Sequence, residues 1–419
     1  MSGATLDWQE TRLPEERERD LMLRLPALVA QAQSAPGWAR ILEGVDAAGI
    51  GTRAALAQLP VTRKSDLKAL QAQDKPFGGL TSTAARALGR IYMSPGPIFD
   101  AEGRGPDWWR FGRALYAAGV RPGGLLQNCF SYHFTPAAFM VESAAARIGC
   151  TVIPAGSGQT ELQVQAMAEL RPDTYVGTPS FLKLIVEKAR EMGQDIGSVQ
   201  HAMLSAEALP DSLRQWFVEQ GIPHVCQAYA SADAGAIAFE TRTDGVLNPG
   251  MVLDEEIILE IVRPGSGEPV APGEVGEVVL TVFNADYPLI RFATGDLSAI
   301  LVDTPPSPCG RTNTRIRGWL GRADQTTKVR AMFVHPSQVH DVVRRHPAVT
   351  KARLVVTGTI ADETMTLHCE VDDPARAGDG AAIVADIRAV TKLRGDVRFV
   401  ARGSLPNDGK VIDDARDYI

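Results

Sequence analysis

Short apolar runs alternate with amphipathic stretches between about residue 120 and residue 230. Within the amphipathic stretches apolar residues recur every three or four positions, which is the spacing of one face of a helix. Strands that alternate with helices at a spacing of roughly 25 residues are typical of a mostly parallel α/β sheet. We therefore expect strands over 125–130, 151–156, 174–178, 201–206 and 224–230, separated by helices over 136–149, 160–170, 180–193 and 210–221.

The pattern changes on either side of this segment. Residues 10–70 have the periodicity of helices. Beyond residue 245 apolar runs lie between turns rich in Gly and Pro, which predicts a smaller β subdomain with strands over 255–262, 276–283 and 297–302. A further alternation predicts a compact C-terminal α/β domain of about ninety residues. Its expected helices are near 336–345 and 381–392, and its expected strands are near 351–357, 364–371 and 396–400.

Chain length and net charge limit the expected number of domains and the expected binding partners. The chain has 419 residues, which is more than one hydrophobic core usually supports, so at least two domains are expected. The net charge is -7 and like charges form no block, so neither nucleic acid nor a membrane surface is an expected partner. Small molecules are the expected partners instead. The oligomeric state stays open, with a homodimer as one option.

Features that the sequence lacks limit the expected cellular compartment and the classes of enzyme to which the protein can belong. The N-terminal residues hold no apolar stretch of signal-peptide length, which predicts a cytoplasmic protein. Five scattered cysteines without a C-x-x-C pair predict reduced, mostly buried thiols rather than a disulfide framework or a zinc site. The chain has no G-x-G-x-x-G fingerprint of a dinucleotide-binding reductase and no G-x-S-x-G elbow of a hydrolase.

Candidate chemistry lies in polar segments that follow the expected strands or come near the C-terminus. In a mostly parallel sheet, ligands bind beyond the carboxyl ends of the strands. The segments are PAGSGQTELQVQ at 154–165, LSAEAL at 204–209, QAYASAD at 227–233, YPLIRFATGDL at 287–297, GRADQTTKVRAMFVHPSQV at 321–339 and LPNDGKVID at 405–413. In this order and spacing they resemble the adenylate-forming superfamily, and in detail its phenylacetate–CoA ligase branch.

The resemblance spans about residues 90 to 413 and implies a fold and an activity. The implied fold is a large N-terminal domain (1–321), a hinge (322–328) and a small mobile C-terminal domain (329–419). The implied reaction joins a carboxylic acid, phenylacetate-like in this branch, to the α-phosphate of ATP and then transfers the acyl group to coenzyme A. ATP, Mg²⁺ and coenzyme A are therefore the expected cofactors.

Four residues match the family's nucleotide and hinge positions. Asp296 in ATGDL matches the carboxylate that accepts hydrogen bonds from the ribose hydroxyls. Arg322 in GRAD is similar to the arginine that reaches the nucleotide, a task that suits a guanidinium group. Asp324 matches the hinge residue, and Lys410 is similar to the lysine that stabilises charge at the α-phosphate during adenylation. The alternatives are structural: Asp296 as the cap of a turn and Lys410 as a solvated surface lysine.

The resemblance also implies an adenine-binding region. Its members are Ser205, Ala206, Glu207, Tyr229, Ala230 and Ser231. Tyr229 corresponds to the tyrosine that packs on the base. Asp233 stands where the family has a magnesium-binding Glu, and Ala230 replaces a Gly. An aspartate still suits Mg²⁺, directly or through water, although it reaches about one methylene less far.

The expected acyl pocket lies at the ends of the early strands. Tyr132, His133 and Phe134 follow the first of them, where the superfamily often has an aromatic–His pair, and are candidates for the pocket wall. Gly156 and Gly158 belong to a segment that resembles the family's Gly-Gly-Gln-Thr, where a glycine allows close backbone approach to the acyl group. A structural role remains the alternative for His133, and Trp108 and Trp109 are expected in the core.

The position of the family's phosphate loop carries YMSPGPIFDAEGRG at 92–105, which has the composition of a loop. Ser94 and Gly96 are its candidate phosphate contacts. It has no Thr and no Lys, two prolines remove amide donors, and two acids add negative charge where the triphosphate would lie. Two hypotheses therefore remain: a working ligase, or a divergent protein that binds AMP, acyl-adenylate or acyl-CoA, or transfers the acyl group to an acceptor other than CoA.

Overall fold

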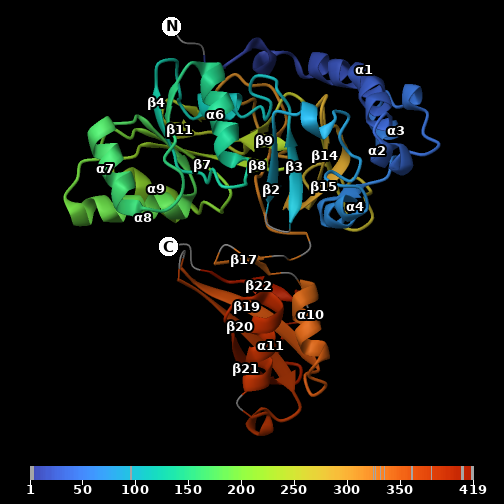
Figure 1. Cartoon of the computed structure of the whole chain (residues 1–419), viewed down its shortest axis with the longest axis vertical. Coiled ribbons are helices and arrows are strands. Elements are labelled where there is room, and N and C mark those ends of the chain that lie inside the picture. Colours follow the sequence, from blue (N-terminus) through green and yellow to red (C-terminus); the bar gives the residue numbers. More distant parts are fainter. Residues whose placement is uncertain are drawn as a thin grey trace. The chain divides into compact units, whose positions relative to one another are not determined.

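The computed structural model describes all residues except 1–3, 95–96, 324, 326, 331, 335, 360–361, 379, 407–409 and 417–419. The chain forms two compact units, Met1–Leu320 and Gly321–Ile419 (Figure 1). In the described part of the chain, no helix has the length and apolar character needed to cross a membrane. All five cysteines are free thiols and four of them are buried, as the sequence predicts.

The first unit is built on an eight-stranded sheet of described residues in the order β16-β12-β9-β8-β7-β6-β4-β5. The strands are β4 (Leu125–Asn128), β5 (Thr151–Ile153), β6 (Thr174–Gly177), β7 (His201–Leu204), β8 (His224–Ser231), β9 (Gly235–Phe239), β12 (Met251–Leu253) and β16 (Arg315–Ile316). Neighbouring strands from β5 to β8 are parallel, and the remaining pairs are antiparallel. The parallel part confirms the predicted α/β class.

Helices connect the parallel strands where the sequence predicts them. They are α6 (Ala137–Ile148), α7 (Thr160–Leu170), α8 (Pro179–Met192) and α9 (Asp211–Glu219), preceded by α5 (Gly112–Ala117). Local sequence fixes their ends. At the start of α8 the Thr178 hydroxyl accepts a hydrogen bond from the Phe181 amide and Pro179 occupies the first turn, while Gly193 ends the helix with a φ of 63°.

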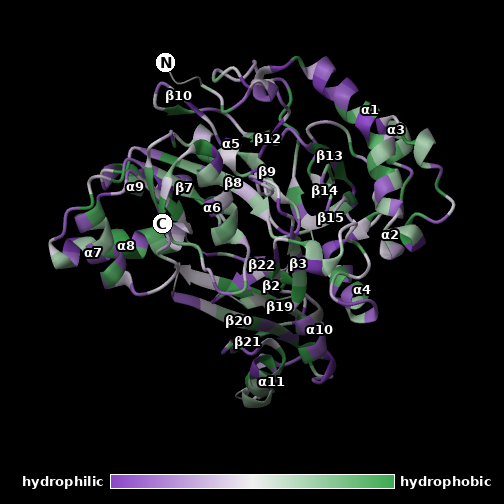
Figure 2. Ribbon diagram, turned by 45° about the horizontal axis from the view of Figure 1, so that its top comes forward, coloured by the Kyte–Doolittle hydropathy of each residue, from purple (hydrophilic) through white to green (hydrophobic). Residues whose placement is uncertain are grey.

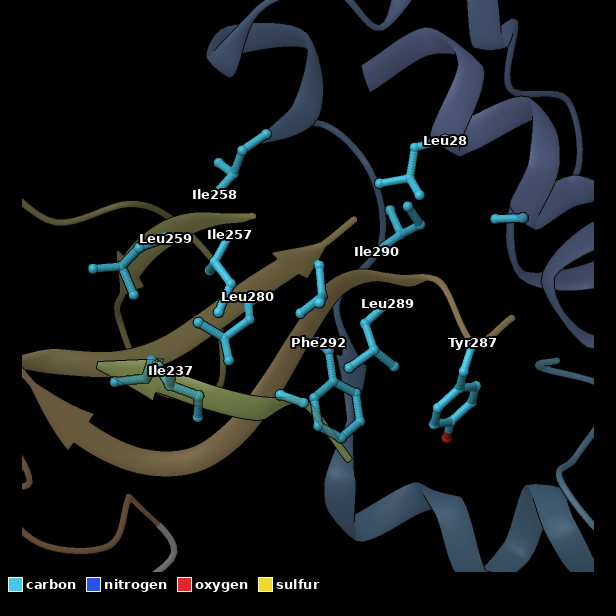
Figure 3. Close-up of a cluster of buried hydrophobic side chains, with 14 of the residues drawn as sticks. Leu28, Ile237, Ile257, Ile258, Leu259, Leu280, Tyr287, Leu289, Ile290 and Phe292 are labelled. Atoms are coloured by element: carbon cyan, nitrogen blue, oxygen red, sulfur yellow. The ribbon is translucent and has the colours of Figure 1, made fainter. Parts of the chain in front are cut away.

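A second sheet in the first unit has the order β1-β15-β14-β13 among the described strands. Its strands are β1 (Thr62–Arg63), β13 (Ile257–Val262), β14 (Gly276–Val282) and β15 (Leu289–Ser298), and the N-terminal helices are α1 (Pro14–Gln33), α2 (Pro36–Ile41), α3 (Arg53–Leu56) and α4 (Leu67–Gln73). Buried apolar side chains from this sheet and from α1 form one core (Figure 3). In Figure 2, β13 and β14 carry mainly hydrophobic residues, whereas α1 mixes hydrophilic and hydrophobic ones.

Two predictions in this unit are wrong. The expected strand at 297–302 is not a separate element: β15 begins earlier and ends at Ser298, whose hydroxyl donates to the Gly318 carbonyl at 2.7 Å. The loop expected over 92–105 is instead largely an antiparallel hairpin of β2 (Arg90–Ser94) and β3 (Ile98–Glu102), in which Ser94 faces Ile98. Residues 95–97 lie between the two strands in the sequence. A smaller pair, β10 (Arg242–Thr243) with β11 (Val246–Leu247), completes the described strands of this unit.

The second unit is a four-stranded sheet with two helices in its described part. Its elements are β17 (Thr327–Val329), β18 (Met332–Val334), α10 (Pro336–Arg344), β19 (Lys351–Thr359), β20 (Asp362–Val371), α11 (Ala381–Thr391), β21 (Asp396–Ala401) and β22 (Ile412–Asp414). The main sheet has the order β21-β20-β19-β22, and β17 pairs with β18 separately. Its core is aliphatic. Helices and strands predicted for this domain are found within a few residues of their expected ends.

Candidate nucleotide-binding site

Asp296 and Tyr229 are brought together from different sheets of the first unit. Tyr229 lies on β8 and its hydroxyl donates a 2.8 Å hydrogen bond to Asp296 Oδ2, on β15. The indole nitrogen of Trp319 donates to the other oxygen, Oδ1, at 3.1 Å. The backbone amide of Asp296 binds the Thr294 hydroxyl oxygen at 3.1 Å, and Gly295 has a φ of 76°. The half-buried carboxylate is therefore held in one orientation.

The segment after β7 carries the expected adenine contacts. Ser205 is buried, and its hydroxyl donates to the Ala228 carbonyl on β8 at 2.8 Å. Ala206 is exposed with a φ of 69°, a left-handed conformation that costs a residue with a side chain about 1–2 kcal/mol. Glu207 accepts from the Ser180 amide at 3.1 Å, at the start of α8. Backbone strain of this kind often occurs at binding sites.

The end of β8 has an irregular geometry that the sequence did not predict. The β8–β9 register shifts between Tyr229 and Ala230, so a bulge lies where the family has a glycine. The Ser231 hydroxyl accepts a hydrogen bond from the Ala234 amide at 3.1 Å. This turn directs Asp233 inward, where it is only 3% exposed.

The expected metal ligand, Asp233, forms an ion pair. Lys64, in the short helix Lys64–Asp66, donates to Asp233 Oδ2 at 2.5 Å, while Asp233 Oδ1 has no hydrogen-bond partner in the described part of the chain. Burial opposes the charge of Lys64, but the carboxylates of Asp233, Asp100 and Asp296 outweigh burial and raise the pKa of this lysine. The unpartnered oxygen of Asp233 and the surrounding negative charge fit a divalent cation.

Asp100 is a third acid in the same place. It lies on β3 and is 1% exposed. Burial, then the charge of Asp233, raises the pKa of Asp100 to about 7, against the influence of the Lys64 charge and of a hydrogen bond from Ser94. Glu102, the other buried acid of this strand, accepts a hydrogen bond at each of its two carboxylate oxygens. The donors are the guanidinium group of Arg90, at 2.9 Å, and the hydroxyl of Tyr92.

The expected acyl wall follows β4. The Tyr132 hydroxyl donates to Glu142 at 2.6 Å and accepts from Asn128 at 2.9 Å, which fixes the ring at the end of the strand. The rings of His133 and Phe134 meet edge to face at 4.6 Å, and both residues are exposed. The structure thus places Tyr132 beside the strand end and leaves the next two side chains at the surface.

The glycine segment of the expected acyl site accepts hydrogen bonds from a side chain of α7. Gly156 and Gly158 have positive φ values of 68° and 84°. A β-carbon on Gly156 would lie 3.8 Å from the Tyr132 ring, which brings this segment against the aromatic wall. The side-chain amide of Gln163, on α7, donates to the carbonyls of both glycines at 3.0 and 3.2 Å.

Three predicted site residues lie after Leu320, in the expected hinge or in the second unit. Arg322 precedes β17, and Lys410 is exposed, with its ammonium group 3.3 Å from Asp413 Oδ1. Asp324 lies outside the described residues, as does Gly96 in the first unit. Their expected roles stay predictions.

Sequence reasoning missed three residues that shape the first unit's site. Trp319 and Lys64 contact the predicted acids Asp296 and Asp233, and Gln163 supports the glycine segment. The only available signals were local: a tryptophan just before GRAD, a lysine after a Thr-Arg pair, and a glutamine in the matched segment PAGSGQTELQVQ. None of these signals specifies a tertiary contact.

Comparison with known proteins agrees with this geometry. The model of the family described as AMP-binding enzyme matches residues 110–282. A phenylacetate–coenzyme A ligase from Thermus thermophilus is 30% identical over 417 residues, covering 95% of this chain and 92% of that protein. The chain belongs to the phenylacetate–CoA ligase family. Another family relative, from Aromatoleum evansii, is 26% identical and covers 80% of this chain and 77% of its own length.

Solved structures share the family fold. The crystal structure of a 2-hydroxyisobutyryl-CoA ligase, in complex with 2-HIB-AMP and CoA in the thioesterification state, superposes with a TM-score of 0.77. The match covers 98% of this chain and 92% of that structure, at 23% sequence identity. This likeness confirms the α/β fold class over both units.

Proposed function

We propose that the protein is an AMP-forming acid–CoA ligase that activates an aromatic or related carboxylic acid, phenylacetate-like in class. In the first step a carboxylate oxygen bonds to the α-phosphorus of ATP and pyrophosphate leaves. In the second step the sulfur of CoA bonds to the acyl carbon, AMP leaves, and the thiol proton is released. Curated relatives named as phenylacetate–coenzyme A ligases support this activity and the substrates ATP and CoA.

The observation that carries the proposal is the clamped carboxylate of Asp296. Tyr229 and Trp319 each donate to a different oxygen of this group. A carboxylate oriented in this way accepts two adjacent hydroxyl donors without reorganising, which suits the 2′- and 3′-hydroxyls of a ribose. The strained, exposed Ala206 and the neighbouring Glu207 backbone would border the adenine.

Residues of both units would act in adenylation. Lys410 would approach the α-phosphate and offset the negative charge that develops there, and Arg322 would bind the nucleotide from the hinge. Asp324 would serve as the pivot that exchanges the groups facing the substrate between the two steps. Tyr132 and the segment containing Gly156 and Gly158 would border the acyl group.

A magnesium ion suits the buried acids near the expected triphosphate. Asp233 would hold it through the oxygen that has no partner among the described residues. When bound, the ion supplies positive charge to the phosphate oxygens and to the leaving pyrophosphate.

A release assay tests the proposal. Purified protein with ATP, Mg²⁺ and a panel of aryl-acetic and benzoic acids should release pyrophosphate, and AMP should accumulate with turnover when CoA is added. Omitting CoA separates the two steps, because acyl-adenylate then stays bound after one turnover. Absence of pyrophosphate across the panel would contradict the proposal.

The hairpin at the phosphate-loop position favours a second candidate. Because β2 and β3 pair up to Ser94 and Ile98, few backbone amides remain to bind a triphosphate. The alternative is a protein that binds AMP, acyl-adenylate or acyl-CoA without forming the adenylate, or that uses an acceptor other than CoA. Calorimetric binding of AMP or acyl-CoA with no pyrophosphate release would favour it. A cytoplasmic location and a homodimer stay predictions.

A further inference from the structure

A buried glutamine of α7 restrains the glycine segment of the expected acyl site. Gln163 is 4% exposed. Its side-chain Nε2 group lies within hydrogen-bond distance of three carbonyl oxygens, those of Ala155 at 3.1 Å, Gly156 at 3.0 Å and Gly158 at 3.2 Å. An amide NH₂ group has two protons, so the three oxygens share them. One side chain therefore restrains the stretch 155–158 at three points.

The other end of the same amide binds β4 and the residue that follows it. Gln163 Oε1 accepts a hydrogen bond from Gln127 Nε2 at 2.7 Å and one from the Cys129 thiol at 3.4 Å. Burial raises the pKa of Cys129 to about 12, so the thiol keeps its proton and can donate. Position 163 therefore needs a donor at one end of the side chain and an acceptor at the other. A carboxylate cannot donate, and an aliphatic side chain can do neither.

The glycine segment has little conformational preference of its own. Gly156, Gly158 and Gln159 have positive φ values of 68°, 84° and 50°. Glycine loses more conformational freedom on folding than any other residue, so contacts from outside the segment must hold it in one conformation. Ser157 and Gly158 are exposed, and a β-carbon on Gly158 would meet no atom beyond its chain neighbours within 4 Å. This part of the segment is therefore accessible to a ligand.

The segment is also tied to the aromatic wall. The Gly156 amide donates to the Asn128 carbonyl at 2.9 Å, and the side-chain amide of Asn128 donates to the Tyr132 hydroxyl at 2.9 Å. A β-carbon on Gly156 would lie 3.8 Å from the Tyr132 ring. A displacement of the segment would therefore change the space beside this ring, where the acyl group is expected.

We propose that Gln163 is a positioning residue for the carboxylic acid, which fixes the glycine segment against Tyr132 and thereby sets the shape of the acyl site. It acts through the segment and does not touch the substrate. The proposal rests on the proposed function, because the acid is the substrate of that ligase. The expected nucleotide residues Tyr229 and Asp296 lie on β8 and β15, so a change at Gln163 should affect the acid more than ATP.

Steady-state pyrophosphate release tests the proposal through two Michaelis constants. The acid is the aryl-acetic or benzoic acid that the wild type uses fastest. Gln163→Met keeps the length of the side chain but lacks both polar ends, and it should raise the KM for the acid about ten- to hundredfold. The KM for ATP should stay within about twofold. Gln165→Met is the matched control: Gln165 is an exposed residue of the same helix that donates to Glu169 at 2.9 Å, and its loss should leave both constants unchanged.

Gln163→Glu adds a readout that a packing role would not move. At a pH of about 8 the carboxylate of this variant has no proton to donate to the three carbonyl oxygens. Burial favours the neutral form of a carboxyl group, so lowering the pH to about 6 should restore one donor. The KM for the acid, relative to the wild type at the same pH, should therefore fall severalfold between these two pH values. The protonated and ionised forms have nearly the same shape, so packing alone predicts no such recovery.

Amide hydrogen exchange, followed by mass spectrometry, requires no activity. In Gln163→Met the peptide that covers residues 154–159 should exchange at least about fivefold faster than in the wild type, whereas peptides from β6 should keep their rate. The Gln165→Met control should exchange like the wild type in both regions.

Three results would overturn the proposal: a KM for ATP that rises as much as the KM for the acid, no recovery of Gln163→Glu at lower pH, or wild-type exchange of the peptide 154–159 in Gln163→Met. A wild type that releases no pyrophosphate contradicts the proposed ligase instead. Calorimetric affinity for the tightest-binding acid of the panel, with AMP present, then replaces the KM: a weaker affinity in Gln163→Met supports the role of Gln163, and an unchanged affinity or no binding of any acid overturns it.

Discussion

Removing the Tyr229 hydroxyl tests how the ribose carboxylate is oriented. Tyr229→Phe keeps the ring but deletes the 2.8 Å bond to Asp296 Oδ2. A hydrogen bond to a charged group contributes about 1.5–3 kcal/mol, and both partners are at least half-buried, so we expect a loss of about 1–2 kcal/mol in the free energy of unfolding. Trp319 still binds the other oxygen, so only part of the orientation is lost. That part should weaken AMP binding by about 1 kcal/mol, or roughly fivefold.

The matched control is Tyr287→Phe. Tyr287 is also a buried tyrosine, but its hydroxyl has no partner in the described residues. This variant should be as stable as the wild type or more so, and AMP should bind it unchanged in the absence of divalent ions. Isothermal titration calorimetry with AMP and urea unfolding give the two quantities. If Tyr229→Phe loses stability but keeps AMP affinity within about twofold, the clamp on Asp296 does not serve nucleotide binding and the reasoning is refuted.

Three further changes test other parts of the account. Lys64→Met should lower the free energy of unfolding by about 3 kcal/mol, because it leaves the Asp233 carboxylate buried without its positively charged partner. Urea unfolding of Lys64→Met, Asp233→Asn and the double variant should show that the two losses are strongly non-additive. Additive losses would mean that the two side chains are not coupled. Burial, then the charge of His224, lowers the pKa of His201 below 6.5 in the folded chain. As the pH drops from about 7 to 5, the unfolded chain therefore binds more protons at this histidine than the folded chain does, and the free energy of unfolding should fall. His201→Gln should flatten this dependence in urea unfolding, and an unchanged slope would contradict it. Lys410→Ala should slow adenylation by about 10²–10³-fold in a pyrophosphate-exchange assay while thioester formation from supplied acyl-adenylate persists; equal loss in both steps would argue against its role.

The sequence predicted the parallel sheet well because each strand and helix there has a strong local signal. β6 is buried along its whole length, β7 is buried from its second residue on, and α8 has a cap, an initial proline and a terminal glycine, so the local preferences agree with the tertiary fold. The strand expected at 297–302 failed for the opposite reason. Its apolar residues suggest a strand, but a tertiary hydrogen bond from Ser298 to Gly318 lies at the point where β15 ends.

From the sequence, site residues could be predicted only where they belong to a recognisable motif. Asp296 and Asp233 could be chosen from their motifs, whereas Lys64 lies 169 positions before its partner and nothing local connects the two. The hairpin over 90–102 was missed because Pro95 and Pro97 favour a loop, while the pairing that forms it depends on a register that composition does not specify. Asp100 lies on the second strand of this hairpin, and composition does not indicate that it is buried.

The measurement that tests the central claim most directly is pyrophosphate release by the wild-type protein with ATP, Mg²⁺ and a panel of carboxylic acids, with and without CoA. The account predicts that at least one aryl-acetic or benzoic acid gives one equivalent of pyrophosphate without CoA and continued release of pyrophosphate and AMP with it. No release with any acid, together with calorimetric binding of AMP, would contradict the claim and identify a nucleotide-binding protein that has lost adenylation.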